Sequence, residues 1–200
     1  MFKKKPLFIV FEGIEGCGKS YQSKKLYNNL KRLKIPVILT REPGGTPSAE
    51  IIRNLILKDY YNFNAKEKFN KYTDTLLYLA ARNEHIINKI APSIKKGKIV
   101  ISDRYIDSTF AYQVYGKGVN KKFIQNIHKF ILMNIKPDIT FILKVKYDIS
   151  KKRLKKRKTK NRYDKFSRSF YIQTQKAFLK IAKNKRNYYV LDASNDTPDL

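Results

Sequence analysis

A glycine-rich turn near the start of the chain carries a lysine and a hydroxyl group at the spacing used to bind phosphates. It occupies residues 13–20, reads GIEGCGKS, and follows the G-x-x-x-x-G-K-S pattern of a P-loop. Its glycines permit backbone conformations that other residues avoid, and they keep Cβ atoms away from a phosphate. Lys19 is placed to reach the β- and γ-phosphates, and the Ser20 hydroxyl is placed to bind Mg²⁺. The predicted triphosphate site comprises Gly13, Ile14, Glu15, Gly16, Cys17, Gly18, Lys19 and Ser20.

A second polar pair, Asp103 and Arg104, follows the apolar run Ile99–Ile101. An aspartate that ends a strand beside a phosphate site typically holds Mg²⁺ through water, although the same position also suits a helix N-cap. Arg104 is placed to clamp a phosphate with its planar guanidinium group. In a chain this rich in lysine, positions that remain arginine indicate sites where the planar group matters. The further arginines that we consider are Arg41, Arg53, Arg82, Arg153, Arg157 and Arg162.

Alternating strands and helices must position these residues. Apolar runs predict strands at 7–12, 37–40, 98–102, 139–145 and 188–192. Periodicity predicts helices at 19–33, 71–90, 108–115, 123–132 and 170–182, and a further helix that Ser48 caps. The alternation favours a three-layer α/β fold of the P-loop NTPase type, with a five-stranded parallel sheet flanked by helices. Because ligands bind beyond the carboxyl ends of parallel strands, we expect the P-loop, Arg41-Glu42 and Asp103-Arg104 to converge at one edge.

Length and composition indicate one cytoplasmic domain over residues 1–200. A chain of 200 residues suits a single core, and none of its apolar runs is long enough to cross a membrane. The one cysteine, Cys17, excludes an internal disulfide and fits a reducing compartment. The net charge of +28 would suit nucleic acid, but the lysines are spread along the chain without a recognisable binding motif. We therefore expect neither a nucleic-acid partner nor a membrane.

Five segments together resemble the thymidylate kinase family, whose members phosphorylate dTMP with ATP. They occur in the family's order, and the resemblance extends over residues 7 to about 192. The segments that contain Arg41 and Arg104 are specific to this family among nucleotide kinases, whereas the P-loop alone does not distinguish it. The five segments are Phe11–Ser20, Thr40–Thr46, Tyr78–Arg82, Asp103–Gln113 and Asn161–Asp164.

The resemblance implies a set of residues around dTMP. Glu15 would accept a hydrogen bond from the 3′-hydroxyl group, while Arg53 and Arg104 would hold the phosphate. Tyr78, where the family usually has phenylalanine, would stack on thymine, and Arg82 would hydrogen-bond its O4 atom. The other acceptor-side residues would be Arg41, Glu42, Pro43, Ser108, Thr109, Gln113 and Tyr112, the last of which would crowd C2′ and favour deoxyribose.

The basic segment at about 151–166 resembles the family's lid, which closes over the triphosphate. The P-loop has no basic residue at positions 14, 15 and 17, and in the bacterial type of the family this goes with catalytic arginines in the lid. Arg153 would then stack near adenine. The resemblance also implies a homodimer, with ATP as donor and Mg²⁺ as metal. It implies that Lys19, Arg104, Arg157 and Arg162 are catalytic and that Ser20 and Asp103 bind the metal.

Two other functions stay open from the residues alone. A kinase for another monophosphate or for a deoxynucleoside would share the P-loop and differ in its acceptor residues. A nucleotide-dependent nucleic-acid binder would use the basic surface and would show salt-sensitive retention on RNA or DNA. His85 and His128 have no partner at metal-ligand spacing, so we expect them to be ordinary helix residues and expect no zinc or iron site.

Overall fold

The computed structural model describes residues 6–57, 69–157 and 162–195. Within these ranges, one sheet contains five parallel strands in the order β2-β3-β1-β4-β5. The predicted five-stranded parallel sheet is confirmed, with each boundary within one residue of its expected place. The strands are β1 (Phe8–Glu12), β2 (Val37–Arg41), β3 (Ile99–Asp103), β4 (Ile139–Lys144) and β5 (Tyr188–Asp192).

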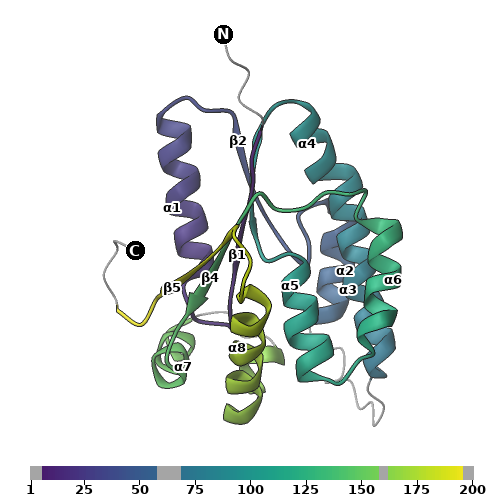
Figure 1. Ribbon diagram of the computed structural model, residues 1–200, viewed down its shortest axis with the longest axis vertical. Helices are drawn as coiled ribbons and strands as arrows, with labels where there is room; N and C mark the ends of the chain where they lie inside the picture. The colour runs from purple at the N-terminus through teal and green to yellow at the C-terminus, as the bar shows by residue number, and fades with distance from the viewer. Residues whose placement is uncertain (1–5, 58–68, 158–161, 196–200) are drawn as a thin grey trace.

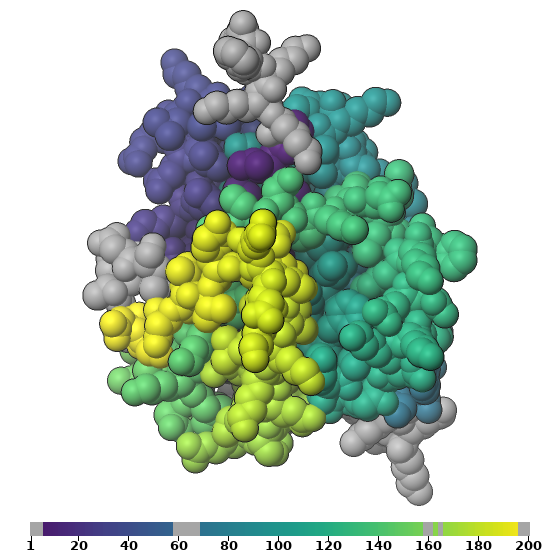
Figure 2. Space-filling view, in the orientation of Figure 1, coloured from purple at the N-terminus to yellow at the C-terminus, as the bar shows by residue number. Residues whose placement is uncertain are grey.

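Helices cover both faces of the sheet, which confirms the three-layer arrangement (Figure 1). The helix bounds are α1 (Lys19–Arg32), α2 (Pro47–Leu57), α3 (Lys71–His85), α4 (Ala91–Lys95), α5 (Ile106–Thr109), α6 (Lys121–Ile131), α7 (Tyr147–Lys155) and α8 (Arg168–Ala182). The π-helical segments η2 (Ile86–Ile90) and η3 (Phe110–Gly116) and the 3₁₀ turn η4 (Arg162–Lys165) extend these elements. α8 packs against η3, and their surfaces meet on the face shown in Figure 2.

Side chains of the central strand β1 serve both layers of helices. Ile9 packs in a cluster with Leu26 of α1 on one face. Phe8 packs in a cluster with Ile86 of η2 on the other face. Because both faces are buried, the strand is apolar at successive positions instead of alternating with polar residues.

The helix predicted over 71–90 consists of several segments. α3 ends at His85, the wider turn η2 follows, and α4 continues to Lys95. The helix predicted over 108–115 is likewise divided between α5 and η3. Apolar periodicity continues through such wide turns, so the sequence pattern does not reveal them. Residues 58–68, and residues 158–161 of the predicted lid, lie outside the described residues.

The prediction that Ser48 caps α2 is wrong, because the helix begins one residue earlier, at Pro47. The Thr46 hydroxyl group instead accepts a hydrogen bond from the backbone N–H of Ala49 at 3.2 Å. Proline suits the first helical position, since its missing N–H has no partner there. The Ser48 hydroxyl group donates to Glu84 of α3 at 2.7 Å and so joins the two helices.

No helix in the described part of the chain has the length and apolar character needed to span a membrane.

Candidate active site

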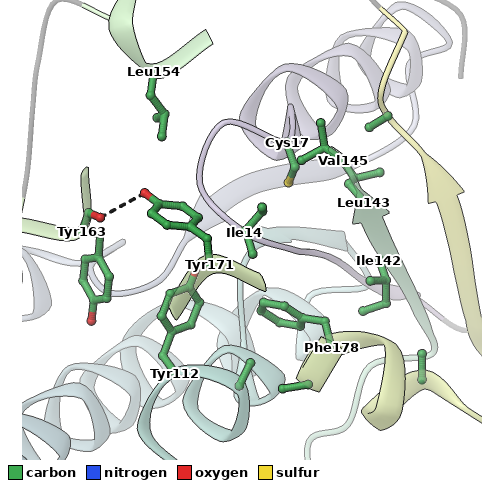
Figure 3. Close-up of a cluster of buried hydrophobic side chains, with 14 residues drawn as sticks. Ile14, Cys17, Tyr112, Ile142, Leu143, Val145, Leu154, Tyr163, Tyr171 and Phe178 are labelled. Carbon is green, nitrogen blue, oxygen red and sulfur yellow. Dashed lines mark hydrogen bonds between the residues drawn. The ribbon is translucent and has the colours of Figure 1, made fainter. Parts of the chain in front are cut away.

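A cavity of about 430 Å³ lies where the carboxyl ends of β1, β2 and β3 meet. The expected convergence of polar segments at this edge is confirmed. Of the predicted residues, its wall contains Glu15, Gly16, Gly18, Lys19, Ser20, Arg41, Glu42, Pro43, Arg53, Tyr78, Arg82, Asp103, Arg104, Ser108, Thr109, Tyr112, Gln113, Arg153 and Arg157. The predicted residues Gly13, Ile14, Cys17 and Arg162 are not part of this wall. The side chains of Ile14 and Cys17 belong to the buried cluster beneath it (Figure 3).

Backbone strain and close packing require glycine at two P-loop positions. Gly13 and Gly16 have φ angles of +137° and +71°, a backbone conformation that residues other than glycine rarely adopt. A Cβ atom on Gly13 would lie 2.5 Å from a β4 carbonyl oxygen, and one on Gly16 would lie 2.6 Å from an α7 carbonyl oxygen. The Lys19 ammonium group lies within this loop, where it donates to the Ile14 carbonyl at 2.7 Å.

The two predicted metal ligands lie side by side. The Ser20 hydroxyl group donates a hydrogen bond to the Asp103 carboxylate, which brings the P-loop and the end of β3 together. Among the described residues, no group of three or more Asp, Glu, His or Cys side chains forms a metal site made of protein alone. The hydroxyl and carboxylate oxygens fit Mg²⁺ as part of a shell that phosphate oxygens and water complete.

Arg104 joins the P-loop to the acceptor side of the cavity. Its guanidinium group donates to the Gly13 carbonyl at 2.9 Å, to Ser108 Oγ at 3.0 Å and to Glu15 Oε1 at 2.7 Å. The Tyr112 hydroxyl group also donates to Glu15. Although burial opposes the charge, Tyr112 and Glu15 raise the pKa of Arg104 well above its ordinary value, so the cation is permanent. Its φ angle of +75° is strained for a non-glycine residue, as is frequent at functional sites.

Arg82 is fixed in the cavity wall by several protein acceptors. It forms a buried ion pair with Glu42 at 2.8 Å, and it donates to Thr109 Oγ1 at 2.8 Å and to the Tyr105 carbonyl at 2.9 Å. Burial opposes ionisation of Glu42, but Arg82 and His85 hold the pKa of this carboxyl group below its usual value. The contact of Arg82 with thymine O4 stays a prediction.

The expectation that His85 and His128 are ordinary helix residues is wrong, because both belong to this buried network. His85 places Nδ1 3.1 Å from Glu42 Oε1 and Nε2 2.6 Å from Thr40 Oγ1. His128 Nε2 lies 2.9 Å from Arg82 Nη1. Burial and the charge of Arg82 lower the pKa of His128 to about 3, so its neutral ring accepts a hydrogen bond from the arginine. His85 lies three positions after Arg82 and therefore on the same face of the helix. This spacing is the sequence signal that places His85 in the network.

His128→Gln is expected to make folding less sensitive to acid, because glutamine retains an acceptor for Arg82 and does not titrate. The pKa of His128 lies near 3 in the folded protein and near 6.5 in an unfolded chain. The folded state therefore binds fewer protons between these values, and stability falls as the pH falls below 6.5. At pH 5 the wild type should lose about 2 kcal/mol more than the variant, relative to pH 7.5. Urea unfolding at the two pH values measures this difference, and equal losses would contradict it.

Two glutamates, Glu12 and Glu50, hold the predicted site residues in place. The sequence alone did not identify them. Glu12 accepts hydrogen bonds from the backbone N–H groups of Tyr105 and Ser108 and from the Ser108 hydroxyl group, and so anchors the start of α5. Burial and the nearby Asp107 raise the pKa of Glu12 to about 7. Because Glu12 precedes the P-loop directly, it links the P-loop to the start of α5. The sequence signal for Glu12 is an acidic residue at the end of a buried apolar strand.

Glu50 of α2 contacts two arginines, Arg41 at the end of β2 and Arg53 on α2 itself. Its carboxylate lies 3.2 Å from Arg41 Nη2 and 3.9 Å from Arg53 Nε, and it accepts the backbone N–H of Gly45 at 2.9 Å. Arg53 also donates to the Pro43 carbonyl. Burial and the charge of Arg41 lower the pKa of Arg53. The result is a cationic end of the cavity, suited to an acceptor phosphate.

Gln113 offers a donor to a ligand in the same cavity. Its side chain is buried in the wall, and within the described ranges its amide nitrogen has no hydrogen-bond partner. Leaving a buried donor unpaired costs about 1–3 kcal/mol. A carbonyl oxygen of a bound base would satisfy this donor.

The three predicted lid arginines occupy different places. Arg153 reaches across α7 to the carbonyls of Ala193 at 2.8 Å and Asn195 at 3.1 Å. Arg157 lies in the cavity wall. Arg162 is paired with Asp74 of α3 and lies outside that wall. The structure thus brings Arg157 into the cavity wall and does not bring Arg162 there.

Comparison with known proteins agrees with this geometry. Residues 11–200 match the family model of thymidylate kinase. A thymidylate kinase of Wolbachia pipientis subsp. Culex pipiens is 44% identical over 90% of this chain and 83% of its own length. A thymidylate kinase from a Sulfurihydrogenibium species is 39% identical over 96% of this chain and 92% of its own length. The crystal structure of thymidylate kinase from Ehrlichia chaffeensis superposes with a TM-score of 0.75 at 35% identity, over 98% of this chain and 92% of that one.

Proposed function

Because this chain belongs to the thymidylate kinase family, a family of dTMP kinases, we propose that it transfers the γ-phosphoryl group of ATP to dTMP with Mg²⁺ as the metal. One observation carries the proposal: a P-loop and an arginine-rich acceptor pocket line the same cavity. An enzyme that transfers a phosphoryl group from one nucleotide to another must hold both reacting groups in one water-poor space. A deoxynucleoside kinase would not need the cationic end formed by Arg41 and Arg53.

The donor side comprises Lys19, Ser20 and Asp103. We propose that Lys19 leaves the Ile14 carbonyl to bind the β- and γ-phosphates, because its ammonium group lies within the loop that surrounds them. Ser20 and Asp103 would hold Mg²⁺, which neutralises phosphate charge when bound. Arg153 would border the adenine, since it joins the P-loop side to the segment after β5.

The acceptor side comprises the arginines and rings of the opposite wall. Arg53 and Arg104 would orient the dTMP phosphate for in-line attack, and Tyr78 would stack on thymine. The Gln113 amide and the Tyr112 ring would border the base and the sugar. A monophosphate is already ionised near neutral pH, so no general base is required. Arg157 would supply lid charge to the phosphoryl group as it moves between the two nucleotides.

A coupled assay of ADP release tests the proposed function directly. ATP and Mg²⁺ are supplied with dTMP, dUMP, UMP, AMP or thymidine in separate reactions. We expect dTMP to give the highest kcat/KM and thymidine to give no turnover, because it lacks the attacking phosphate. Equal rates with AMP, or turnover of thymidine, would contradict the acceptor assignment.

Two expectations concern the surroundings of the enzyme. A cytoplasmic location and the lack of a nucleic-acid partner both remain predictions. Filter binding at physiological salt checks the second, because a basic nucleic-acid binder would be retained there and would be released as salt rises.

We also propose that the enzyme is a homodimer. Apolar side chains on α2, α3 and η2 face solvent in the single chain, namely Ile51, Leu76 and Ile87, which are 73%, 47% and 47% exposed. Leu76 and Ile87 lie about three turns apart along one helical face. Leu76→Glu should therefore shift the protein toward the monomer, because it buries a charge in such an interface. Sedimentation equilibrium measures the mass, and a wild type that sediments as a monomer would contradict the proposal.

A further inference from the structure

Asp74 of α3 is a buried carboxylate held between two cations from distant parts of the chain. Its side chain is 3% exposed, and Lys117, which follows η3, donates to Oδ2 at 2.7 Å. Its other oxygen pairs with Arg162 of η4. Removing one partner from a buried ion pair leaves an uncompensated charge, which is strongly unfavourable. The attachment of Arg162 to α3 therefore differs from an exposed ion pair, which contributes little.

Tyr78 lies one helical turn after Asp74 and contacts the same segment. Its hydroxyl group is hydrogen-bonded to that of Tyr163, and Arg162 Nη2 lies 3.4 Å from it. The guanidinium carbon of Arg162 lies 5.9 Å from the centre of the Tyr78 ring and 5.4 Å from that of Tyr163. Residues four positions apart project from one side of a helix. A single face of α3 therefore holds η4.

The opposite side of η4 contacts the core beneath the cavity. The Tyr163 ring packs edge to face on Tyr112, with 5.3 Å between ring centres. The Tyr163 carbonyl accepts a hydrogen bond from Tyr171 of α8 at 3.0 Å, as the dashed line in Figure 3 shows. Tyr78 and Tyr163 both line the cavity. η4 is therefore part of the wall next to the acceptor pocket.

We propose that Asp74 and Tyr78 are positioning residues that dock η4 against the acceptor side of the cavity, with Arg162 as the cationic half of the dock. The inference rests on the proposed function, because it takes the wall at Tyr78 as the place where the acceptor base binds. Docking completes that wall, so its loss weakens acceptor binding more than it slows phosphoryl transfer. This role for Arg162 differs from the charge-stabilising role that the sequence predicts.

The test is a double-mutant cycle with Tyr78→Phe and Tyr163→Phe, which remove hydroxyl groups and keep both rings. Each single change should raise KM for dTMP about fivefold, and the double change should raise it no further. The reason is that both single variants and the double variant lose the same hydrogen bond between the two hydroxyl groups. The values of kcat and of KM for ATP should change by less than about twofold. Tyr72→Phe is the control on the same helix, because Tyr72 packs on Phe123 of α6 and not on η4. It should leave KM for dTMP unchanged.

A measurement without nucleotide separates this inference from the proposed function. Asp74→Asn removes the charge that Arg162 pairs with, so backbone amides of the peptide 162–171 should exchange with deuterium about tenfold faster or more. Unchanged exchange, additive effects of the two tyrosine changes, or a fall in kcat at constant KM for dTMP would overturn the docking role. A wild type inactive with every monophosphate would overturn the proposed function instead, and the exchange result would then decide the docking role alone.

Discussion

Lys19→Met is expected to lower kcat about a thousandfold, or about 4 kcal/mol in transition-state stabilisation, while KM for dTMP changes little. The lysine is 6% exposed and lies inside the P-loop, where the proposed reaction requires positive charge to neutralise the transferred phosphoryl group. Methionine has a similar length and no charge, so the loop loses the cation and little packing. Steady-state kinetics with varied dTMP at saturating ATP measures both constants.

The matched control is Lys24→Met, which removes the same charge from an exposed position of the same helix α1. It should retain wild-type kcat, because its ammonium group lies in solvent and away from the cavity. Thermal unfolding of both variants separates a catalytic loss from a folding defect. Similar kcat values for Lys19→Met and the wild type would show that the P-loop lysine does not act on the phosphoryl group.

The sequence was sufficient to predict the sheet and the meeting of the P-loop with the end of β3, because these depend on local patterns. Each strand is a short apolar run, and the P-loop is one continuous stretch whose glycines meet a backbone requirement at Gly13 and Gly16. The order of segments then brings Asp103 to the loop, since parallel strands end at one edge. The hydrogen bond between Ser20 and Asp103 follows from this topology.

Side-chain partners far apart in the sequence were not predictable in this way. His128 reaches Arg82 from another helix, and periodicity says only that both residues are helical. The pairing of Asp74 with Arg162 depends on how η4 lies against α3, which no local pattern specifies. The resemblance in the 161–164 segment selects Arg162, but it does not tell whether the guanidinium group faces phosphate or carboxylate.

The different places of the lid arginines lead to the second large prediction. Arg157→Ala should lower kcat about a thousandfold, because a well-placed arginine stabilises the charge of the transferring phosphoryl group. Arg157 lines the cavity, whereas Arg162 is held on Asp74, so the effect on kcat should be much larger at position 157. KM for dTMP should remain within about twofold of the wild type, since Arg157 is not among the residues proposed to hold dTMP.

Two further variants show what the arginine contributes. Lys156→Ala removes the neighbouring charge from an exposed position, and its kcat should equal that of the wild type. Arg157→Lys keeps a positive charge and loses the planar fork, so it should recover only part of the activity. Full recovery would mean that charge alone is needed, whereas an Arg157→Ala variant with normal kcat would remove this arginine from phosphoryl transfer. In that case the P-loop lysine and Arg104 would have to supply that charge.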